Sequence, residues 1–360
     1  MSTNLDPGTP IGMAVIGAGY WGPNLIRNIS ASESCHLRWV CDLDIERARR
    51  AVGRYSTVEV TDDLARVLAD DEVHAVAIAT PAHTHAAVAL ACLDAGKHVL
   101  VEKPLAWTVE EGRQVLERAA ALGLTLMCDH TYCYTSAVQE LRELVHSGAI
   151  GDLLYVDSVR INLGLVQPDI DVFWDLGPHD LAILDVVLPP GRRPVAVSAT
   201  GADPLGTGQV CLGYLTLQLE GGAMAHAHLN WLSPTKVRTT IIGGSERMVV
   251  WDDLNPSQRV SVYDSGVSIH GGGDDPAAVR QDRLISYRAG ALHAPALPER
   301  EALRSVIGEF VASIREGRPP LTDGGAGLRV LEILDAASAS LQRGGASVAL
   351  PGRSVPSPTA

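Results

Sequence analysis

A chain of 360 residues that is 46% hydrophobic and 20% charged is long enough for two domains and has the composition of an ordinary globular protein. Its net charge of −13 excludes the basic surface that nucleic acids and anionic membranes require, so we expect neither as a partner. The sequence shows no basic, apolar leader and no apolar run near the length of about 18 residues that a membrane span needs, so we expect a cytoplasmic protein.

The first part of the chain alternates apolar runs with helical stretches, after a polar segment of residues 1–10 that we expect to be flexible. Near-continuous apolar runs such as 74–80 are typical of parallel strands covered on both faces. The alternation predicts an α/β domain over 11–130 with a doubly wound parallel sheet. The expected strands are 11–16, 36–41, 58–60, 74–80, 97–101 and 124–128, and the expected helices after the first are 44–52, 62–69, 84–95 and 108–122.

The first strand leads directly into a glycine-rich turn, G-x-G-x-x-G, and then into a helix. Gly17 permits the tight turn, Gly19 lets the backbone approach a pyrophosphate, and Gly22 lets helix and strand pack closely. The helix N-terminus favours the negative charge of a phosphate. Asp42 ends the second strand, where a carboxylate accepts the ribose 2′-OH of NAD and repels the 2′-phosphate of NADP. Because no Arg or Lys adjoins Asp42 in the sequence, we predict a Rossmann domain that prefers NAD.

The pattern changes beyond residue 130, in a second domain that we place at 131–345. Extended runs joined by short glycine turns indicate an α+β domain with a large, mostly antiparallel open sheet. Residues 264–298 are polar and rich in glycine and predict a long loop, and 346–360 a flexible tail. The last two helices are candidates to pack back on the first domain. The elements expected here are helices 135–146, 175–188, 299–316 and 325–342 and strands 153–162, 193–200, 208–219, 223–232, 236–243 and 246–252.

Five segments carry a family resemblance: AVIGAGYWGPNL at 14–25, ATPAHTH at 79–85, VEKPLA at 101–106, SGAIGDLLYV at 147–156 and WDLGPHDLAILD at 174–185. In order and spacing they resemble the Gfo/Idh/MocA family of NAD(P)-dependent oxidoreductases. The resemblance implies a Rossmann domain joined to an open-sheet domain, with the substrate between them against the nicotinamide. Three further stretches look most like nucleotide-sugar 3-dehydrogenases and related sugar ketoreductases: GYWGPNL at 19–25, RINLG at 160–164 and NWLSPTKVR at 230–238.

The resemblance also implies which residues contact the cofactor. It places Thr80, Pro81 and His85 beside the ribose and nicotinamide, Glu102 on the nicotinamide side, and Lys103 toward the substrate. The expected cofactor-binding residues are Gly17, Gly19, Tyr20, Trp21, Gly22, Asp42, Thr80, Pro81, His85, Glu102 and Lys103.

Lys103 follows the carboxyl end of an expected strand, at the crevice where doubly wound sheets bind ligands. A desolvated lysine can release a proton, whereas arginine in effect cannot, and only three of the 29 cationic residues here are lysines. A Glu102–Lys103 surface ion pair is the alternative interpretation, and we favour a role in proton transfer or alkoxide stabilisation.

Asp175 and His179 are four residues apart at the start of an expected helix and therefore lie on one face. A carboxylate beside an imidazole can orient the ring and support its proton. A helix N-terminal acid and a core histidine are the alternative, and the D-x-x-x-H signature implied by the resemblance favours catalysis. We assign His179 as the base, Lys103 as the cation that holds the alkoxide, and Asp175 as the residue that fixes the ring, with the first two roles exchangeable.

Other polar residues are assigned more simply. His83 with His85, and His226 with His228, have the H-x-H spacing of metal ligands but no persuasive third ligand, so we expect no metal. His226, His228 and Asn230 share one face of a strand, which we interpret as solvated or subunit-facing. The six cysteines have no C-x-x-C spacing, and we expect free thiols. The candidates for substrate binding are Arg160, Asn162, Lys236 and Arg238.

These observations predict an NAD-dependent oxidoreductase that transfers hydride between nicotinamide and a sugar carbinol, C3 of a nucleotide-linked hexose. The alternatives are a cyclitol or free-sugar dehydrogenase, an enzyme that retains NAD and cleaves a glycosidic bond, and a cofactor-sensing protein with an inactive site. We expect a homodimer or homotetramer, because a partly apolar sheet face with Leu212 and Tyr214 on one side of a strand is usually buried between subunits.

Overall fold

The computed structural model describes residues 8–53, 56–164, 166, 169–264, 266–270, 284–288 and 290–352. The chain divides into two compact units, each made of two separate stretches of sequence. Unit 1 comprises residues 1–135 and 299–335, and unit 2 comprises residues 136–298 and 336–360. No described helix is long and apolar enough to cross a membrane.

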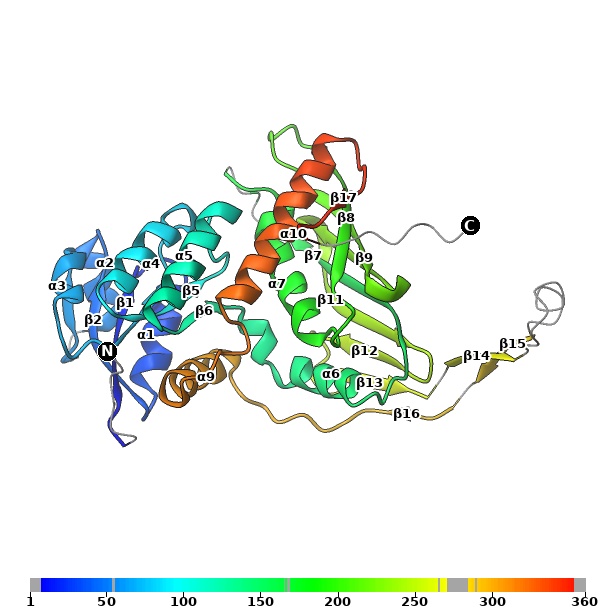
Figure 1. The fold of residues 1–360 in the computed structure, drawn as a ribbon, viewed down its shortest axis with the longest axis horizontal. Helices are drawn as coiled ribbons and strands as arrows, with labels where there is room; N and C mark the ends of the chain where they lie inside the picture. The colour runs from blue at the N-terminus through cyan, green and yellow to red at the C-terminus, as the bar shows by residue number, and fades with distance from the viewer. Residues whose placement is uncertain are drawn as a thin grey trace. The chain divides into compact units, whose positions relative to one another are not determined.

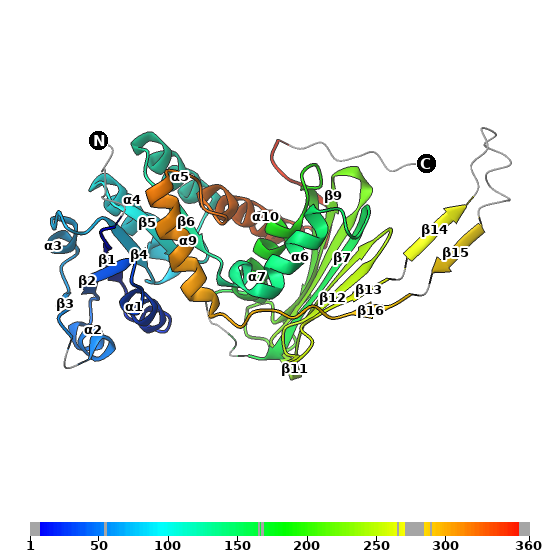
Figure 2. The same ribbon diagram turned by 90° about the horizontal axis from the view of Figure 1, so that it is seen from below.

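Unit 1 is built on a six-stranded sheet of order β3-β2-β1-β4-β5-β6, in which every pair of neighbours is parallel. The chain order reverses between β1 and β4, and helices lie on both faces of the sheet (Figures 1 and 2). The predicted doubly wound parallel sheet is confirmed. Its strands are β1 Ile11–Ile16, β2 Cys35–Cys41, β3 Glu59–Thr61, β4 Ala75–Ile78, β5 His98–Glu102 and β6 Leu126–Asp129. Its helices are α1 Gly22–Ser30, α2 Ile45–Val52, α3 Leu64–Leu68, η1 Ala82–Thr84, α4 His85–Asp94, α5 Val109–Leu122 and η2 Thr131–Tyr134.

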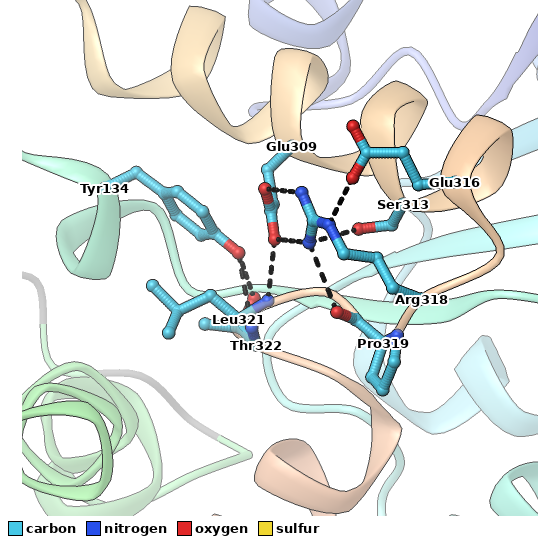
Figure 3. Close-up of polar contacts among 8 residues, drawn as sticks. All are labelled: Tyr134, Glu309, Ser313, Glu316, Arg318, Pro319, Leu321 and Thr322. Carbon is cyan, nitrogen blue, oxygen red and sulfur yellow. Dashed lines mark hydrogen bonds and ion pairs between the residues drawn. The ribbon is translucent and has the colours of Figure 1, made fainter.

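The C-terminal part of the chain completes unit 1. Helix α9 (Ala302–Glu316) packs against α1 and η2, and helix α10 (Gly324–Gln342) begins in this unit. Between them, Thr322 pairs with the edge strand β6: Cys128 N donates to Thr322 O at 2.9 Å, and Thr322 Oγ1 donates to Cys128 O at 2.7 Å. Figure 3 shows the contacts that hold the segment before Thr322, in which two nitrogens of Arg318 donate to the Glu309 carboxylate at 2.7 and 2.9 Å.

Unit 2 is built on a nine-stranded sheet of order β16-β13-β12-β11-β7-β10-β9-β8-β17, antiparallel except between β7 and β10. Helix α7 packs on one face of this sheet and α6 packs on α7 (Figure 2). The predicted mostly antiparallel sheet is confirmed. Its strands are β7 Leu153–Leu163, β8 Pro194–Ala202, β9 Leu212–Leu219, β10 Met224–Asn230, β11 Leu232–Gly244, β12 Met248–Asp252, β13 Val260–Tyr263, β16 Leu292–His293 and β17 Val348–Ala349, and its helices are α6 Ser136–His146, α7 Val172–Val187 and η3 Glu220–Gly222.

Three expectations for unit 2 were wrong. The stretch 264–298 is not one loop, because its described residues contain a hairpin of β14 (Gly266–His270) and β15 (Leu284–Arg288), and then β16. Helix α7 begins at Val172, three residues before the expected start, because Asp171 caps it by accepting from the N–H groups of Phe173 and Trp174 at 2.9 and 3.0 Å. Of the expected flexible tail 346–360, residues 346–352 are described and include strand β17, which pairs with β8, so that part of the expectation was also wrong; residues 353–360 lie outside the described residues.

Candidate active site

The glycine turn after β1 has the geometry that a dinucleotide cradle needs. Gly17 has φ +95°, and a Cβ there would lie 2.5 Å from Ala79 O. A Cβ on Gly22 would lie 2.2 Å from Gly17 O, so this glycine allows the turn to close against α1. A Cβ on Gly19 would instead meet nothing within 4 Å. Two glycines are therefore required by the protein itself, and the third leaves open space where a pyrophosphate can approach the backbone.

Asp42 braces this turn from the end of β2. Its carboxylate accepts from Ala18 N at 2.6 Å and from Asp44 N at 2.8 Å, which holds the turn and the start of α2 together. Arg47, in the first turn of α2, lies 3.9 Å from the same carboxylate. The sequence prediction considered only the residues adjacent to Asp42 and therefore missed this cation. Helix α2 places Arg47 close to the end of β2, although it lies five residues after Asp42.

Exposed apolar side chains flank the cradle. Tyr20 is 97% exposed and Leu43, which follows Asp42, is 95% exposed. Trp21 is half-buried, with its indole N–H in the interior, and Pro81 is exposed while Thr80 is half-buried. Because the protein leaves Tyr20 and Leu43 uncovered on either side of the turn, they are available to the apolar faces of a bound dinucleotide. The residues present thus fit the predicted cofactor, and Leu43 was not among the predicted contacts.

The prediction that His85 contacts the cofactor does not agree with its surroundings. His85 is 1% exposed, and its two ring nitrogens lie 2.7 Å from Pro104 O and 2.9 Å from Thr80 O. Burial lowers its pKa, which favours the neutral ring. His85 therefore links the turn after β5 to the segment after β4.

Glu102 and Lys103 lie at the carboxyl end of β5, as expected for a ligand-binding crevice. Glu102 Oε2 accepts from Lys103 N at 3.2 Å. Burial, and next the neighbouring Asp129 carboxyl, raise the pKa of Glu102 well above its ordinary value. Asp129 was not recognised in the sequence, although its place at the end of β6 was a signal for it.

Asp175 and His179 lie one turn apart on α7, both half-buried. Asp175 is in the first turn, where the helix dipole stabilises a carboxylate, and it accepts from the Trp231 indole at 3.0 Å. These two residues belong to unit 2, whereas Lys103, the residue after β5, belongs to unit 1. Their meeting in one catalytic site stays a prediction.

Arg160 is not available as the predicted substrate-binding residue. It is 3% exposed, and its Nε donates to Asp180 Oδ2 at 2.5 Å on the face of β7 that α7 covers. Ser158 donates to the other oxygen of Asp180 at 2.6 Å. This buried charge pair joins the sheet to α7, so Arg160 has a structural role.

The other predicted substrate contacts lie nearer the surface. Asn162 is half-buried near the end of β7, and Lys236 is exposed where the register of β11 is irregular. Arg238 is 26% exposed and its guanidinium lies 3.5 Å from Asp253. On the other face of the sheet, the Tyr214 ring stacks on His226 and His228, with centroids 5.7 and 4.5 Å apart.

No group of three or more His, Cys, Asp or Glu with the geometry of a metal site occurs among the described residues. All six cysteines are buried and none forms a disulfide.

Comparisons with known proteins agree with this geometry. Residues 11–130 match the oxidoreductase family with an NAD-binding Rossmann fold, GFO_IDH_MocA, and residues 138–250 match the GFO/IDH/MocA C-terminal domain. A UDP-N-acetylglucosamine 3-dehydrogenase of Acidithiobacillus ferrooxidans is 30% identical over 91% of this chain and 98% of its own length. Inositol 2-dehydrogenase 2 of Saccharopolyspora erythraea is 31% identical over 60% of this chain and 66% of its own.

Solved structures show the same relationship. The crystal structure of GenD2 from gentamicin A biosynthesis, in complex with NAD, superposes with a TM-score of 0.78 at 25% identity, covering 97% of this chain and 99% of that one. The chain therefore belongs to the Gfo/Idh/MocA family and is an NAD-binding oxidoreductase that acts on CH–OH groups.

Proposed function

We propose that this oxidoreductase transfers hydride between nicotinamide and C3 of a nucleotide-linked hexose. The observation that carries the proposal is the similarity, along nearly the whole of both chains, to a UDP-N-acetylglucosamine 3-dehydrogenase. The GYWGPNL, RINLG and NWLSPTKVR stretches support the same substrate class.

Bound NAD would supply the hydride acceptor, held by the glycine turn and by Asp42. The remaining chemistry belongs to this chain, because hydride leaves a carbinol carbon only if the hydroxyl proton is removed as charge builds on oxygen. His179 takes that proton, since an imidazole has an ordinary pKa near 6.5 and a lysine ammonium one near 10.4. Lys103 donates a charge-assisted hydrogen bond to the developing alkoxide, and Asp175 stabilises the imidazolium.

The substrate class is tested by comparing a UDP-hexose with the free hexose under NAD turnover, with Arg238→Ala as the diagnostic variant. If Arg238 binds the diphosphate, the variant raises KM for the nucleotide-sugar far more than it lowers kcat. Asp253→Asn is the matched control, because it removes the partner at 3.5 Å but keeps the cation. Equal activity on the free hexose, or an equal rise in KM in both variants, would contradict the diphosphate role.

A cyclitol dehydrogenase is the second candidate, favoured by the similarity to inositol 2-dehydrogenase 2. It differs from the first in needing no cation for a diphosphate, so its KM for inositol should be insensitive to Arg238→Ala. Continuous accumulation of NADH with either substrate separates both dehydrogenases from an enzyme that retains NAD through the cycle.

For the cofactor, we expect NADH to bind at least tenfold more tightly than NADPH, which is about 1.4 kcal/mol. The Asp42 carboxylate accepts a ribose 2′-OH and repels a 2′-phosphate. Fluorescence titration with both cofactors measures the preference. Arg47→Ala should keep or increase it, because Arg47 is the nearby cation that favours phosphate, and tighter binding of NADPH by the unaltered protein would overturn the assignment.

For the assembly, we propose a homodimer or homotetramer built on the uncovered face of the unit 2 sheet. That face carries the Tyr214 stack on His226 and His228 and the 51% exposed side chain of Met224. Light scattering at micromolar concentration should give a multiple of the 38.1 kDa chain mass. Tyr214→Asp places a charge in the stack and should lower that mass, whereas Tyr20→Asp, elsewhere on the surface, should not; a monomer of the unaltered chain contradicts the proposal.

A further inference from the structure

Strands β5 and β6 of unit 1 end side by side with one carboxyl group each. Glu102 and Asp129 are the last residues of these parallel strands and are register partners. Asp129 is 2% exposed, and the Glu102 oxygen Oε1 is fully buried. Two carboxyl groups, each with one buried oxygen, are therefore brought together at the crevice end of the sheet.

In each carboxyl group of the pair, one oxygen accepts a hydrogen bond from a described residue and the other does not. Asp129 Oδ1 accepts from Thr131 Oγ1 at 2.7 Å, and Glu102 Oε2 accepts from Lys103 N at 3.2 Å. The other oxygen of each group, Glu102 Oε1 and Asp129 Oδ2, is buried and has no donor in hydrogen-bonding geometry among the described residues. Two carboxylates are acceptors only, so neither could satisfy the other. One proton between them turns one oxygen into a donor and satisfies both.

We propose that Glu102 and Asp129 share one proton, so that the pair carries a single negative charge and Asp129 is a positioning residue for the Glu102 carboxyl. Two ionised carboxylates in a buried contact would repel each other strongly. Burial and the mutual contact raise the pKa of Glu102, and burial raises the pKa of Asp129.

The charged and polar groups around Glu102 and Asp129 are compatible with one shared proton on the pair. Lys103 is the cation that acts on Glu102, and its charge opposes the rise in the pKa of Glu102. The thiol of Cys128 is neutral, because burial raises its pKa well above its ordinary value, and Cys133 is buried as well. His130, 1% exposed, follows Asp129, and hydrogen bonding with Glu102, Thr131 and the Trp21 indole opposes, without reversing, the rise that burial causes in the pKa of Asp129. One cation facing one net negative charge leaves this end of β5 close to neutral.

The consequence for the reaction rests on the proposed function, in which Glu102 faces the nicotinamide. The oxidised ring is cationic and the reduced ring is neutral, so each negative charge beside it favours NAD⁺ over NADH. A pair with one charge rather than two therefore holds the two forms with more similar affinity, which allows the same site to release either.

The number of negative charges on the Glu102–Asp129 pair is tested by measuring the ratio of the NADH and NAD⁺ dissociation constants. Glu102→Gln and Asp129→Asn each replace a shared proton by an amide, so the pair keeps one negative charge and the ratio should stay within about twofold of the unaltered protein. The double variant loses that charge and should shift the ratio toward NADH by about fivefold or more. If each single variant already produces this shift, both carboxyls were ionised and the proposal is overturned.

Infrared spectroscopy of the chain without cofactor tests the proton independently of the proposed function. At pH 7 the unaltered protein should show the carbonyl stretch of a protonated carboxyl, and both single variants should lose it. Asp171→Asn is the matched control, because Asp171 is another half-buried acid but accepts two N–H groups, and this variant should keep the band. Absence of the band in the unaltered protein refutes the shared proton. A band together with a ratio that stays constant even in the double variant refutes the placement of the nicotinamide instead.

Discussion

His179→Asn is expected to lower kcat by about 10²–10⁴-fold, the usual contribution of a general base. Lys103→Ala should lower kcat at least as much, because it removes the cation that holds the developing alkoxide. Lys103→Arg should not restore the rate although it keeps the charge, since a planar guanidinium cannot occupy the position of an ammonium. The measurement is steady-state NADH formation with the nucleotide-sugar that gives turnover.

Two controls separate chemistry from folding and binding. NADH binding, followed by fluorescence, should survive all three substitutions, because the glycine turn and Asp42 are untouched. Asp175→Asn keeps an oxygen to accept from the Trp231 indole, so the fold should persist while kcat falls through loss of the charge that supports the imidazolium. Near-normal kcat in both Lys103→Ala and His179→Asn would show that the site is misplaced.

Asp180→Ala is expected to destabilise the folded protein by about 3–5 kcal/mol, because it leaves the Arg160 charge buried without its partner. The side chains of both residues are 4% exposed or less, so water cannot take over the role of the carboxylate. Ser158 also loses the acceptor that it contacts at 2.6 Å. Equilibrium denaturation, followed by the fluorescence of buried Trp231 and Trp251, measures the loss in unit 2.

The matched variant replaces both members of the pair, as Arg160→Met with Asp180→Leu. Apolar side chains of similar volume leave no charge in the interior, so this double variant should recover most of the stability lost in Asp180→Ala. A cost below about 1 kcal/mol for Asp180→Ala, the size of an exposed pair, would mean that the pair is solvated.

Local sequence signals were sufficient for the glycine turn and the parallel sheet of unit 1, because both are encoded by residues close together in the sequence. The turn needs Gly17 for its φ of +95° and Gly22 for the approach of α1 to the strand end, and both needs are visible as glycine spacing. The alternation of strands and helices likewise predicts the parallel sheet, which the structure confirms.

The errors at Arg160 and Asp129 came from partners distant in sequence. Arg160 alternates with apolar Val159 and Ile161, so the sequence of β7 suggests that Arg160 lies on the solvent-facing side of the sheet. Its contact with Asp180, on a helix 20 residues later, shows that it lies on the side covered by α7. The role of Asp129 depends on Glu102, its register partner on the neighbouring strand, and the sequence around Asp129 does not show that pairing. The β14–β15 hairpin was taken for a loop because its two five-residue strands are short and lie within a stretch that is polar and rich in glycine as a whole.

The pairing of Thr322 with Cys128 spans 194 residues, so the sheet of unit 1 can be completed only late in the synthesis of the chain. A ribosome releases β6 long before it reaches Thr322, so the β6 edge of the nascent Rossmann sheet stays without this pairing while residues 136–298 of unit 2 are synthesised. An exposed edge strand is a template for pairing with other chains. A gene fragment that ends at residue 135 fixes the sheet in that unfinished state, whereas joining residue 135 through a short linker to residue 299 supplies the segment that covers the edge.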